Sequence, residues 1–260
     1  MSAIRADQLF DLTGKVAVVT GGAGGIGTVY GRALAEAGAA VALADLDGGG
    51  ARAAAEKLAP EGHRAIGVQL DITDPGSAAA MAEAVTARFG GIDILINNAA
   101  LMSEIPRSSL LDLPTEWFER VLRVNVMGAV VCTKAVRDSM VSRGGGRIIN
   151  GSSAGAFMAG GIYGISKLAL HSVTVNLAQE LGPLGINVNG IAPGLVEDEA
   201  GYRSLGKDDP IRGMLAATIP GKKQAPPGDL VGTLLLLCSK AGAWINGQTI
   251  SVDGGWIRRL

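Results

Sequence analysis

Tyr163 and Lys167 are the residues whose types and spacing most directly suggest chemistry. They stand four positions apart, so on a helix they share one face. A tyrosine with an ordinary pKa of about 10 is a poor base at neutral pH. A neighbouring ammonium group favours the phenolate and lowers that pKa. The pair could therefore exchange a proton with a reacting hydroxyl group, although the same spacing alone is also typical of a solvated helix surface.

A glycine-rich segment, Thr20-Gly-Gly-Ala-Gly-Gly-Ile-Gly27, lies between an apolar run at 16–20 and a helical pattern at 26–37. Glycines in such a turn let backbone N–H groups approach a pyrophosphate, and the helix N-terminus favours the anion. The preceding strand, the following helix and an acidic residue at the end of the next strand predict a dinucleotide-binding loop.

Asp45 is that acidic residue, and it bears on which dinucleotide is bound. A carboxylate there can accept hydrogen bonds from the ribose hydroxyls and would repel the 2′-phosphate of NADP. The neighbouring positions carry Leu46 and Gly24 instead of a cation, and Arg52 could reach the site only if the loop folded back. NAD is therefore the favoured cofactor, and NADP is not excluded.

The elements that must position these residues alternate along the chain. Apolar strands are expected at 16–20, 41–45, 65–70, 92–96, 147–150, 186–191 and 249–252, and helices at 26–37, 49–58, 77–89, 114–143, 163–181 and 229–239. Strands that are apolar on both faces and alternate with helices belong to a parallel sheet. We predict an α/β fold: one doubly wound, Rossmann-type, seven-stranded parallel sheet with helices on both faces, in a single domain over residues 1–260.

The segment 196–223 interrupts this pattern with charges, two prolines and only a weak amphipathic period. Ligands of doubly wound sheets bind beyond the carboxyl ends of the strands, where this segment begins. We expect a substrate lid there; a merely solvated loop is the alternative.

Composition excludes several classes of protein. Apolar residues make up 48% of the 260 residues and the net charge is −1, which predicts a globular protein without a basic surface for nucleic acid or anionic membrane. No apolar run approaches the roughly 18 residues of a membrane span, and residues 1–12 lack the apolar core of a signal peptide. Cys132 and Cys238 form no disulfide framework, and His63 and His171 have no spacing for a metal site. We therefore expect a cytoplasmic location and no bound metal.

Taken together, the motifs resemble those of the short-chain dehydrogenase/reductase family over nearly the whole chain. The matching segments are the glycine loop, Asp71-Ile72, Asn97-Asn98-Ala99-Ala100, Pro193-Gly194, and Gly247-Gln248 with Val252 to Gly255. The resemblance implies four catalytic residues, Asn125, Ser153, Tyr163 and Lys167. It implies cofactor contacts from Gly21, Gly25, Ile26, Asp45, Leu46, Asp71, Ile72, Asn98, Tyr163, Lys167, Pro193, Gly194 and Val196.

Two of these assignments leave alternatives open. Ser153 would hold the substrate oxygen near Tyr163 and stabilise charge developing on it. It matches the family's serine position, although the adjacent Ser152 competes for the role. Asn125 is assigned a water relay that connects Lys167 to solvent. Its position inside a helix is also compatible with a purely structural bend.

The resemblance implies hydride transfer between NAD(H) and a secondary alcohol or ketone, with Tyr163 as the general acid/base. It also implies a homo-oligomer, by analogy a tetramer. One alternative is a 3-oxoacyl thioester reductase, for which the lid offers Arg203, Lys207 and Arg212, offset by Asp208 and Asp209. Another is a nucleotide-binding sensor without turnover.

The sequence departs from the family pattern in the substrate region. Tyr163 follows Ser153 by ten positions, which is shorter than usual, and Asp198 replaces a common threonine that meets the nicotinamide carboxamide. An aspartate could accept from the carboxamide NH₂ but could not donate to it. The apolar residues near the expected pocket are Phe157, Met158, Ile162, Leu195 and Met214, which favour a mainly hydrophobic or small cyclic alcohol. Trp117, Trp244 and Trp256 are interpreted as packing residues.

Overall fold

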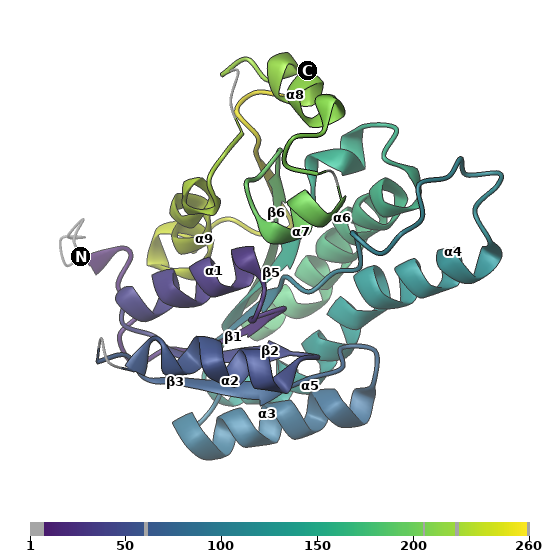
Figure 1. The fold of residues 1–260 in the computed structure, drawn as a ribbon. Helices are drawn as coiled ribbons and strands as arrows, with labels where there is room; N and C mark the ends of the chain where they lie inside the picture. Colours follow the sequence, from purple (N-terminus) through teal and green to yellow (C-terminus); the bar gives the residue numbers. More distant parts are fainter. Residues whose placement is uncertain (1–7, 60–61, 205, 222–223, 259–260) are drawn as a thin grey trace.

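A computed structural model describes residues 8–59, 62–204, 206–221 and 224–258 (Figure 1). In this part of the chain, seven parallel strands form one sheet in the order β3-β2-β1-β4-β5-β6-β7. The strands are β1 (Val16–Thr20), β2 (Ala40–Asp45), β3 (Ala65–Gln69), β4 (Ile94–Asn97), β5 (Gly146–Gly151), β6 (Ile186–Pro193) and β7 (Thr249–Val252). The predicted strand order along the chain and the parallel sheet are confirmed, with every predicted strand end within two residues.

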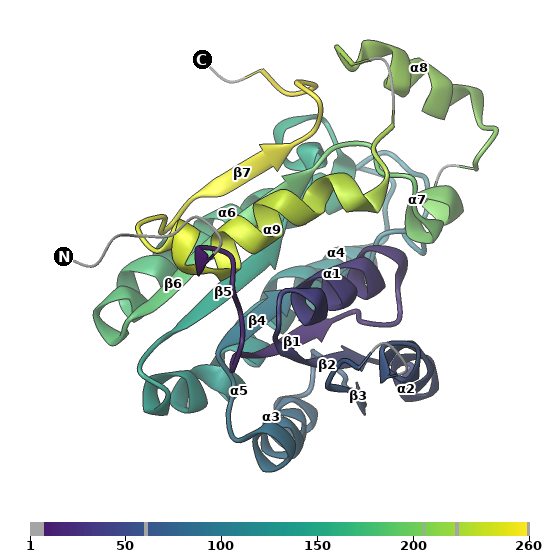
Figure 2. The same cartoon turned by 90° about the vertical axis from the view of Figure 1, so that its left-hand side faces the viewer.

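Helices cover both faces of the sheet because alternate strand residues point to opposite sides. Val19 of β1 packs on one side with α1 (Gly25–Glu36), α2 (Gly48–Glu56) and α9 (Val231–Cys238). Val18 packs on the other side with α3 (Pro75–Phe89), α5 (Gly128–Ser142) and α6 (Gly161–Leu181). Figure 2 looks onto the face that α1 and α9 cover. The result is the doubly wound arrangement expected from the sequence.

The helix predicted over 114–143 is not continuous. It consists of α4 (Thr115–Leu122), a π-helical turn η3 (Arg123–Met127) and α5. Asn125 lies in this turn, and its buried amide bonds to the backbone of Leu101 and to Ser166 instead of to its own helix. Because π-turns often accompany such outside bonds, we attribute the break to Asn125.

The segment predicted as a lid contains two short helices, α7 (Glu199–Ser204) and α8 (Pro210–Thr218), which were not predicted. Both lie beyond the arrowheads of the strands in Figure 2. Asp209 caps α8 by accepting a hydrogen bond from the backbone N–H of Ile211. Residues 205, 222 and 223 of the segment lie outside the described part of the chain.

The strand order reverses between β1 and β4, which places a crevice at their carboxyl ends. The loops that leave these strands are bonded to each other. Thr20 Oγ1 accepts hydrogen bonds from the N–H groups of Asn98 and Ala99, and Asn98 Nδ2 donates to Thr20 O at 3.0 Å. Among the described residues, no helix is both long enough and apolar enough to cross a membrane.

Candidate active site

A cavity of about 640 Å³ opens at this crevice. It extends from Asp45 at the end of β2 to Tyr163 and Lys167 on α6, beneath helix α7. Among its lining residues are Gly21, Gly25, Ile26, Asp45, Leu46, Asp71, Ile72, Asn98, Ser153, Tyr163, Lys167, Pro193, Gly194 and Val196. The structure thus brings every predicted site residue to one cavity except Asn125, which lies behind it.

Glycines let the backbone of the loop pack closely against its neighbours. Gly21 has a φ of +66°, and a Cβ there would lie 2.9 Å from Asn98 Nδ2. A Cβ on Gly27 would lie 2.0 Å from the carbonyl oxygen of Gly21, so helix α1 starts in close contact with the loop. Gly24, the N-cap of α1, supplies no side-chain cap. The first N–H groups of the helix therefore face the cavity as donors, which fits a pyrophosphate.

Asp45 and Asp71 lie at the end of the cavity away from Tyr163 and Lys167. The Asp45 carboxylate accepts from the N–H groups of Ala23 at 3.0 Å and Asp47 at 3.1 Å, and lone pairs remain for further donors. Asp71 Oδ1 accepts from the backbone and hydroxyl of Thr73. Arg52 is exposed and does not line the cavity. This end therefore offers acceptors for ribose hydroxyls.

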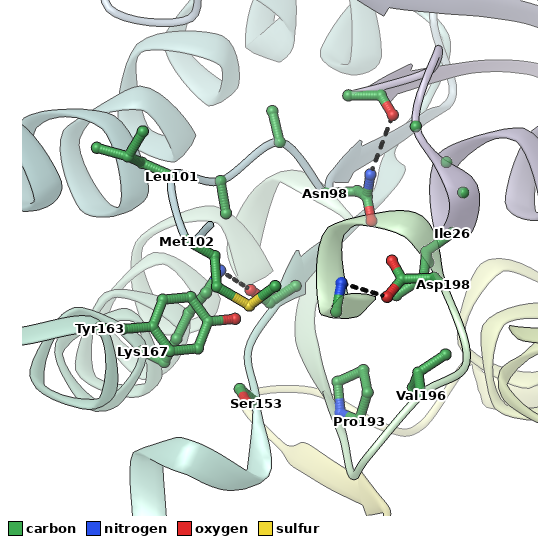
Figure 3. A pocket seen from close by; sticks show the side chains of 18 of the residues that line it. Ile26, Asn98, Leu101, Met102, Ser153, Tyr163, Lys167, Pro193, Val196 and Asp198 are labelled. Carbon is green, nitrogen blue, oxygen red and sulfur yellow. Dashed lines mark hydrogen bonds between the residues drawn. The ribbon is translucent and has the colours of Figure 1, made fainter. Parts of the chain in front are cut away.

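Ser153, Tyr163 and Lys167 converge at the reacting end (Figure 3). Lys167 Nζ donates to Gly151 O at 2.6 Å and lies 5.6 Å from the centroid of the Tyr163 ring. Ser153 interacts with the Tyr163 phenol. Ser152 is buried, and its hydroxyl contacts the ring of His171 and the carbonyl oxygen of Lys167. Both serines line the cavity, and of the two it is Ser153 that interacts with Tyr163.

The pKa values of the pair differ from the sequence expectation. Burial raises the pKa of Tyr163 to about 12; the Ser153 interaction lowers it and the Asp198 charge raises it further. Burial also lowers the pKa of Lys167 to about 8. The predicted lowering of the tyrosine pKa is not seen in the protein without cofactor, because burial is the largest influence on the pKa of each group.

Asn125 does not line the cavity. Its Oδ1 accepts from Leu101 N at 2.7 Å, and its Nδ2 donates to Leu101 O and Ser166 Oγ at 3.0 Å each. The side chain thus ties the loop after β4 to α6, next to Lys167. None of these three hydrogen bonds reaches Lys167 itself.

Asp198 lies on the opposite side of the cavity from Tyr163 (Figure 3). Its Oδ1 accepts from the N–H of Gly201 at 2.8 Å, which anchors the first turn of α7. Its own Cβ is 3.1 Å from where a Cβ on Gly25 would stand. The carboxylate is therefore held against the glycine loop, along the path from that loop to the reacting end.

The predicted apolar lining is only partly correct. Met158 and Leu195 line the main cavity, and Ile162 is buried and lines an adjoining cavity of about 320 Å³. Phe157 instead packs on His171 at 4.8 Å between ring centroids, and Met214 points to solvent. These two residues lie where the sequence pattern gave no information about orientation, in a short 3₁₀ turn and an unpredicted helix.

Arg212 and Trp256 line the cavity but were not predicted as site residues. Arg212 is 1% exposed and donates to Gln224 Oε1, Gly201 O and Val196 O at 2.7, 3.1 and 2.6 Å. The dipeptide Asp209-Pro210 is a helix start signal that could have placed Arg212 on an inward-facing first turn. The interpretation of the tryptophans as packing residues is wrong for Trp244, which is fully exposed.

Three features at the carboxyl ends of the parallel strands define a nucleotide-binding oxidoreductase of Rossmann type. They are the glycine loop, the acidic residue Asp45 that ends β2, and the Tyr–Lys pair. Comparison with known proteins agrees. A family model described as enoyl-(acyl carrier protein) reductase matches residues 21–257. The chain belongs to the short-chain dehydrogenase/reductase family.

Individual relatives cover almost the whole chain. D-threitol dehydrogenase of Mycolicibacterium smegmatis is 36% identical over 97% of this chain and 96% of that protein. Galactitol 2-dehydrogenase of Agrobacterium fabrum is 37% identical over 94% and 98%. A solved structure of a gluconate 5-dehydrogenase from Burkholderia cenocepacia, in complex with NADP and tartrate, has a TM-score of 0.91 at 33% identity, covering 97% of this chain and 98% of that one. This chain is accordingly an oxidoreductase of the dehydrogenase type.

Proposed function

We propose that the protein is an NAD-dependent dehydrogenase that interconverts a secondary alcohol and its ketone, with Tyr163 as the general acid/base. The observation that carries the proposal is the cluster of Ser153, Tyr163 and Lys167 in a cavity that begins at the glycine loop. A non-catalytic sensor would not need these three groups around one point.

The chain's own residues divide the work along the cavity. The N–H groups at Gly25 and Ile26 would hold the pyrophosphate, and Asp45 the ribose hydroxyls. A bound nicotinamide supplies the hydride acceptor or donor. Ser153 donates a hydrogen bond to the substrate oxygen, and Tyr163 exchanges the proton with it. With a pKa of about 12, Tyr163 is protonated before cofactor binds and is ready to protonate a ketone oxygen.

The choice of NAD rests on Asp45. Its carboxylate would repel a 2′-phosphate, and the nearest candidate cation, Arg52, is outside the cavity lining. The solved structures of two similar proteins hold NADP, so likeness alone does not decide the cofactor. We propose NAD on this local electrostatic argument.

The substrate we propose is a polyol or a small cyclic alcohol. Threitol, galactitol and sorbitol dehydrogenases are among the relatives, together with a cis-4-hydroxycyclohexanecarboxylate dehydrogenase. Of the lid cations suggested for a thioester arm, Arg203 lines the cavity and pairs with Glu199 at 3.7 Å, whereas Lys207 does not line it. Arg212 is buried and bonded to Val196, Gly201 and Gln224. This arrangement does not favour a 3-oxoacyl thioester reductase.

We also propose a cytoplasmic homo-oligomer, a tetramer by family analogy. Two observations support it. Cys132 and Cys238 are buried free thiols, as is usual in a reducing compartment. Ile165, Leu168 and Val175 are exposed apolar side chains spaced along one face of α6, which a partner copy could cover.

Replacement of Tyr163 tests the proposed function. Tyr163→Phe removes the proton-transferring hydroxyl, so turnover of secondary alcohols and polyols with NAD⁺ should fall by about 10²–10⁴-fold. Binding of NADH, measured by fluorescence titration, should remain, and NADPH should bind more weakly than NADH. The matched control is Tyr202→Phe, which alters a lid tyrosine outside the cavity lining and should leave turnover unchanged. Unchanged turnover in Tyr163→Phe would contradict the mechanism; tighter NADPH binding would contradict the cofactor.

A further inference from the structure

Asp198 places a negative charge where this cavity would hold a dinucleotide. Its Cβ is 3.1 Å from the Cβ position of Gly25, the first residue of α1, and it faces Tyr163 across the cavity (Figure 3). The hydrogen bond from Gly201 N fixes its Oδ1. The carboxylate therefore stands between the phosphate-binding loop and the reacting end.

No ion pair to Asp198 occurs within the described ranges of the chain. Arg212 is a nearby cation of the lid. A Cβ placed on Gly201 would lie 3.4 Å from Arg212 Nη1 and 2.8 Å from Asp198 Oδ1. The Arg212 guanidinium, however, donates to Val196 O, Gly201 O and Gln224. Lys167 bonds to Gly151 O across the cavity. The Asp198 charge thus has no directly bonded counter-charge.

Such a charge acts differently on two parts of a dinucleotide. The pyrophosphate is anionic in both redox forms, so its repulsion by Asp198 weakens both forms alike. The nicotinamide ring is cationic in NAD⁺ and neutral in NADH, so attraction to a nearby carboxylate strengthens only the oxidised form. The two effects can be separated because only the second changes the ratio of the two affinities.

We infer that Asp198 is a residue that selects the redox state of the cofactor: its carboxylate favours the cationic oxidised nicotinamide over the neutral reduced one. The inference rests on the proposed function, because it requires the dinucleotide to lie along this cavity. The charge of Asp198 acts across the cavity as far as Tyr163. The pKa of Tyr163 is raised by burial and additionally by Asp198. Such a residue holds NAD⁺ more tightly than NADH and so favours the release of NADH.

Asp198→Asn tests the inference with little structural change, because the amide oxygen can still accept from Gly201 N. The measurement is the dissociation constant of NAD⁺ and of NADH, by calorimetric titration without substrate. The ratio Kd(NADH)/Kd(NAD⁺) should fall by about tenfold, equivalent to about 1.4 kcal/mol. NADH should bind more tightly than to the wild type, since the repulsion of its pyrophosphate is also relieved.

Glu199→Gln is the matched control. It removes one negative charge from the next residue, whose side chain is 83% exposed, pairs with Arg203 and does not line the cavity. Its affinity ratio should stay at the wild-type value. An equal change of both affinities in Asp198→Asn, or the same ratio change in Glu199→Gln, would overturn the inference while leaving the proposed function intact. Failure of the wild type to bind either dinucleotide would overturn the proposed function itself.

Discussion

Tyr163 and Lys167 both shift toward their neutral forms in the folded chain, because burial raises the pKa of the tyrosine and lowers that of the lysine. A cationic ring brought in beside Tyr163 would supply the missing positive charge. The location of both residues at one cavity could be predicted from sequence. Their protonation states could not, because these depend on burial.

Ser153 and Ser152 provide a residue-scale prediction. Ser153→Ala removes an interaction that lowers the Tyr163 pKa, so the rising limb of alcohol oxidation against pH should move to higher pH. The rate should also fall by about 10²-fold, as on loss of one donor to a developing oxyanion. The profile of kcat/KM against pH measures both effects.

Ser152→Ala serves as the control for that prediction. Ser152 bonds to Lys167 O and contacts His171 instead of Tyr163, so its loss should reduce the free energy of unfolding by about 1 kcal/mol. The pH profile should not move. A shifted profile in Ser152→Ala with an unshifted one in Ser153→Ala would reverse the assignment of the two serines.

At the scale of elements, the sequence predicted strands well and irregular segments poorly. Runs such as Val16–Thr20 are buried on both faces, and Gly and Asp residues delimit them clearly. The π-helical turn at Asn125 was missed because the chain over 114–143 has a helical pattern throughout, and only the tertiary bonds to Leu101 and Ser166 reveal the break. The lid helices are too short for a periodic signal, with six and nine residues.

Arg212 holds the lid together, which leads to an element-scale prediction. Arg212→Met removes its hydrogen bonds to the start of the lid at Val196, to α7 at Gly201 and to Gln224. The loosened lid should be cut by subtilisin at least several-fold faster, and the KM for the alcohol should rise about tenfold, with a smaller change in kcat.

Lys207→Met, also in the lid, is the comparison variant, because Lys207 is exposed and does not line the cavity. It should resemble the wild type in both cleavage rate and KM. If subtilisin cuts Arg212→Met and the wild type at the same rate, the lid does not depend on this guanidinium.

At the scale of the whole molecule, the exposed apolar face of α6 bears on assembly. Leu168→Arg places a charge in the middle of the face formed with Ile165 and Val175. If copies associate through this face, the mass in light scattering after gel filtration should fall below that of the wild type. Leu111→Arg, at an exposed leucine before α4, should keep the wild-type mass. A monomeric wild type would contradict the proposed oligomer.

The pairing of β1 with β4 has a consequence for the order of folding. These strands are neighbours in the sheet although β2 and β3 lie between them in the chain, so the crevice forms only when sequence-distant halves have docked. Contacts of this kind form late and slowly. Affinity for the nucleotide should therefore appear at the end of refolding, and the ligand then shifts the folding equilibrium by mass action. Bound cofactor would therefore stabilise only those chains in which the sheet is complete.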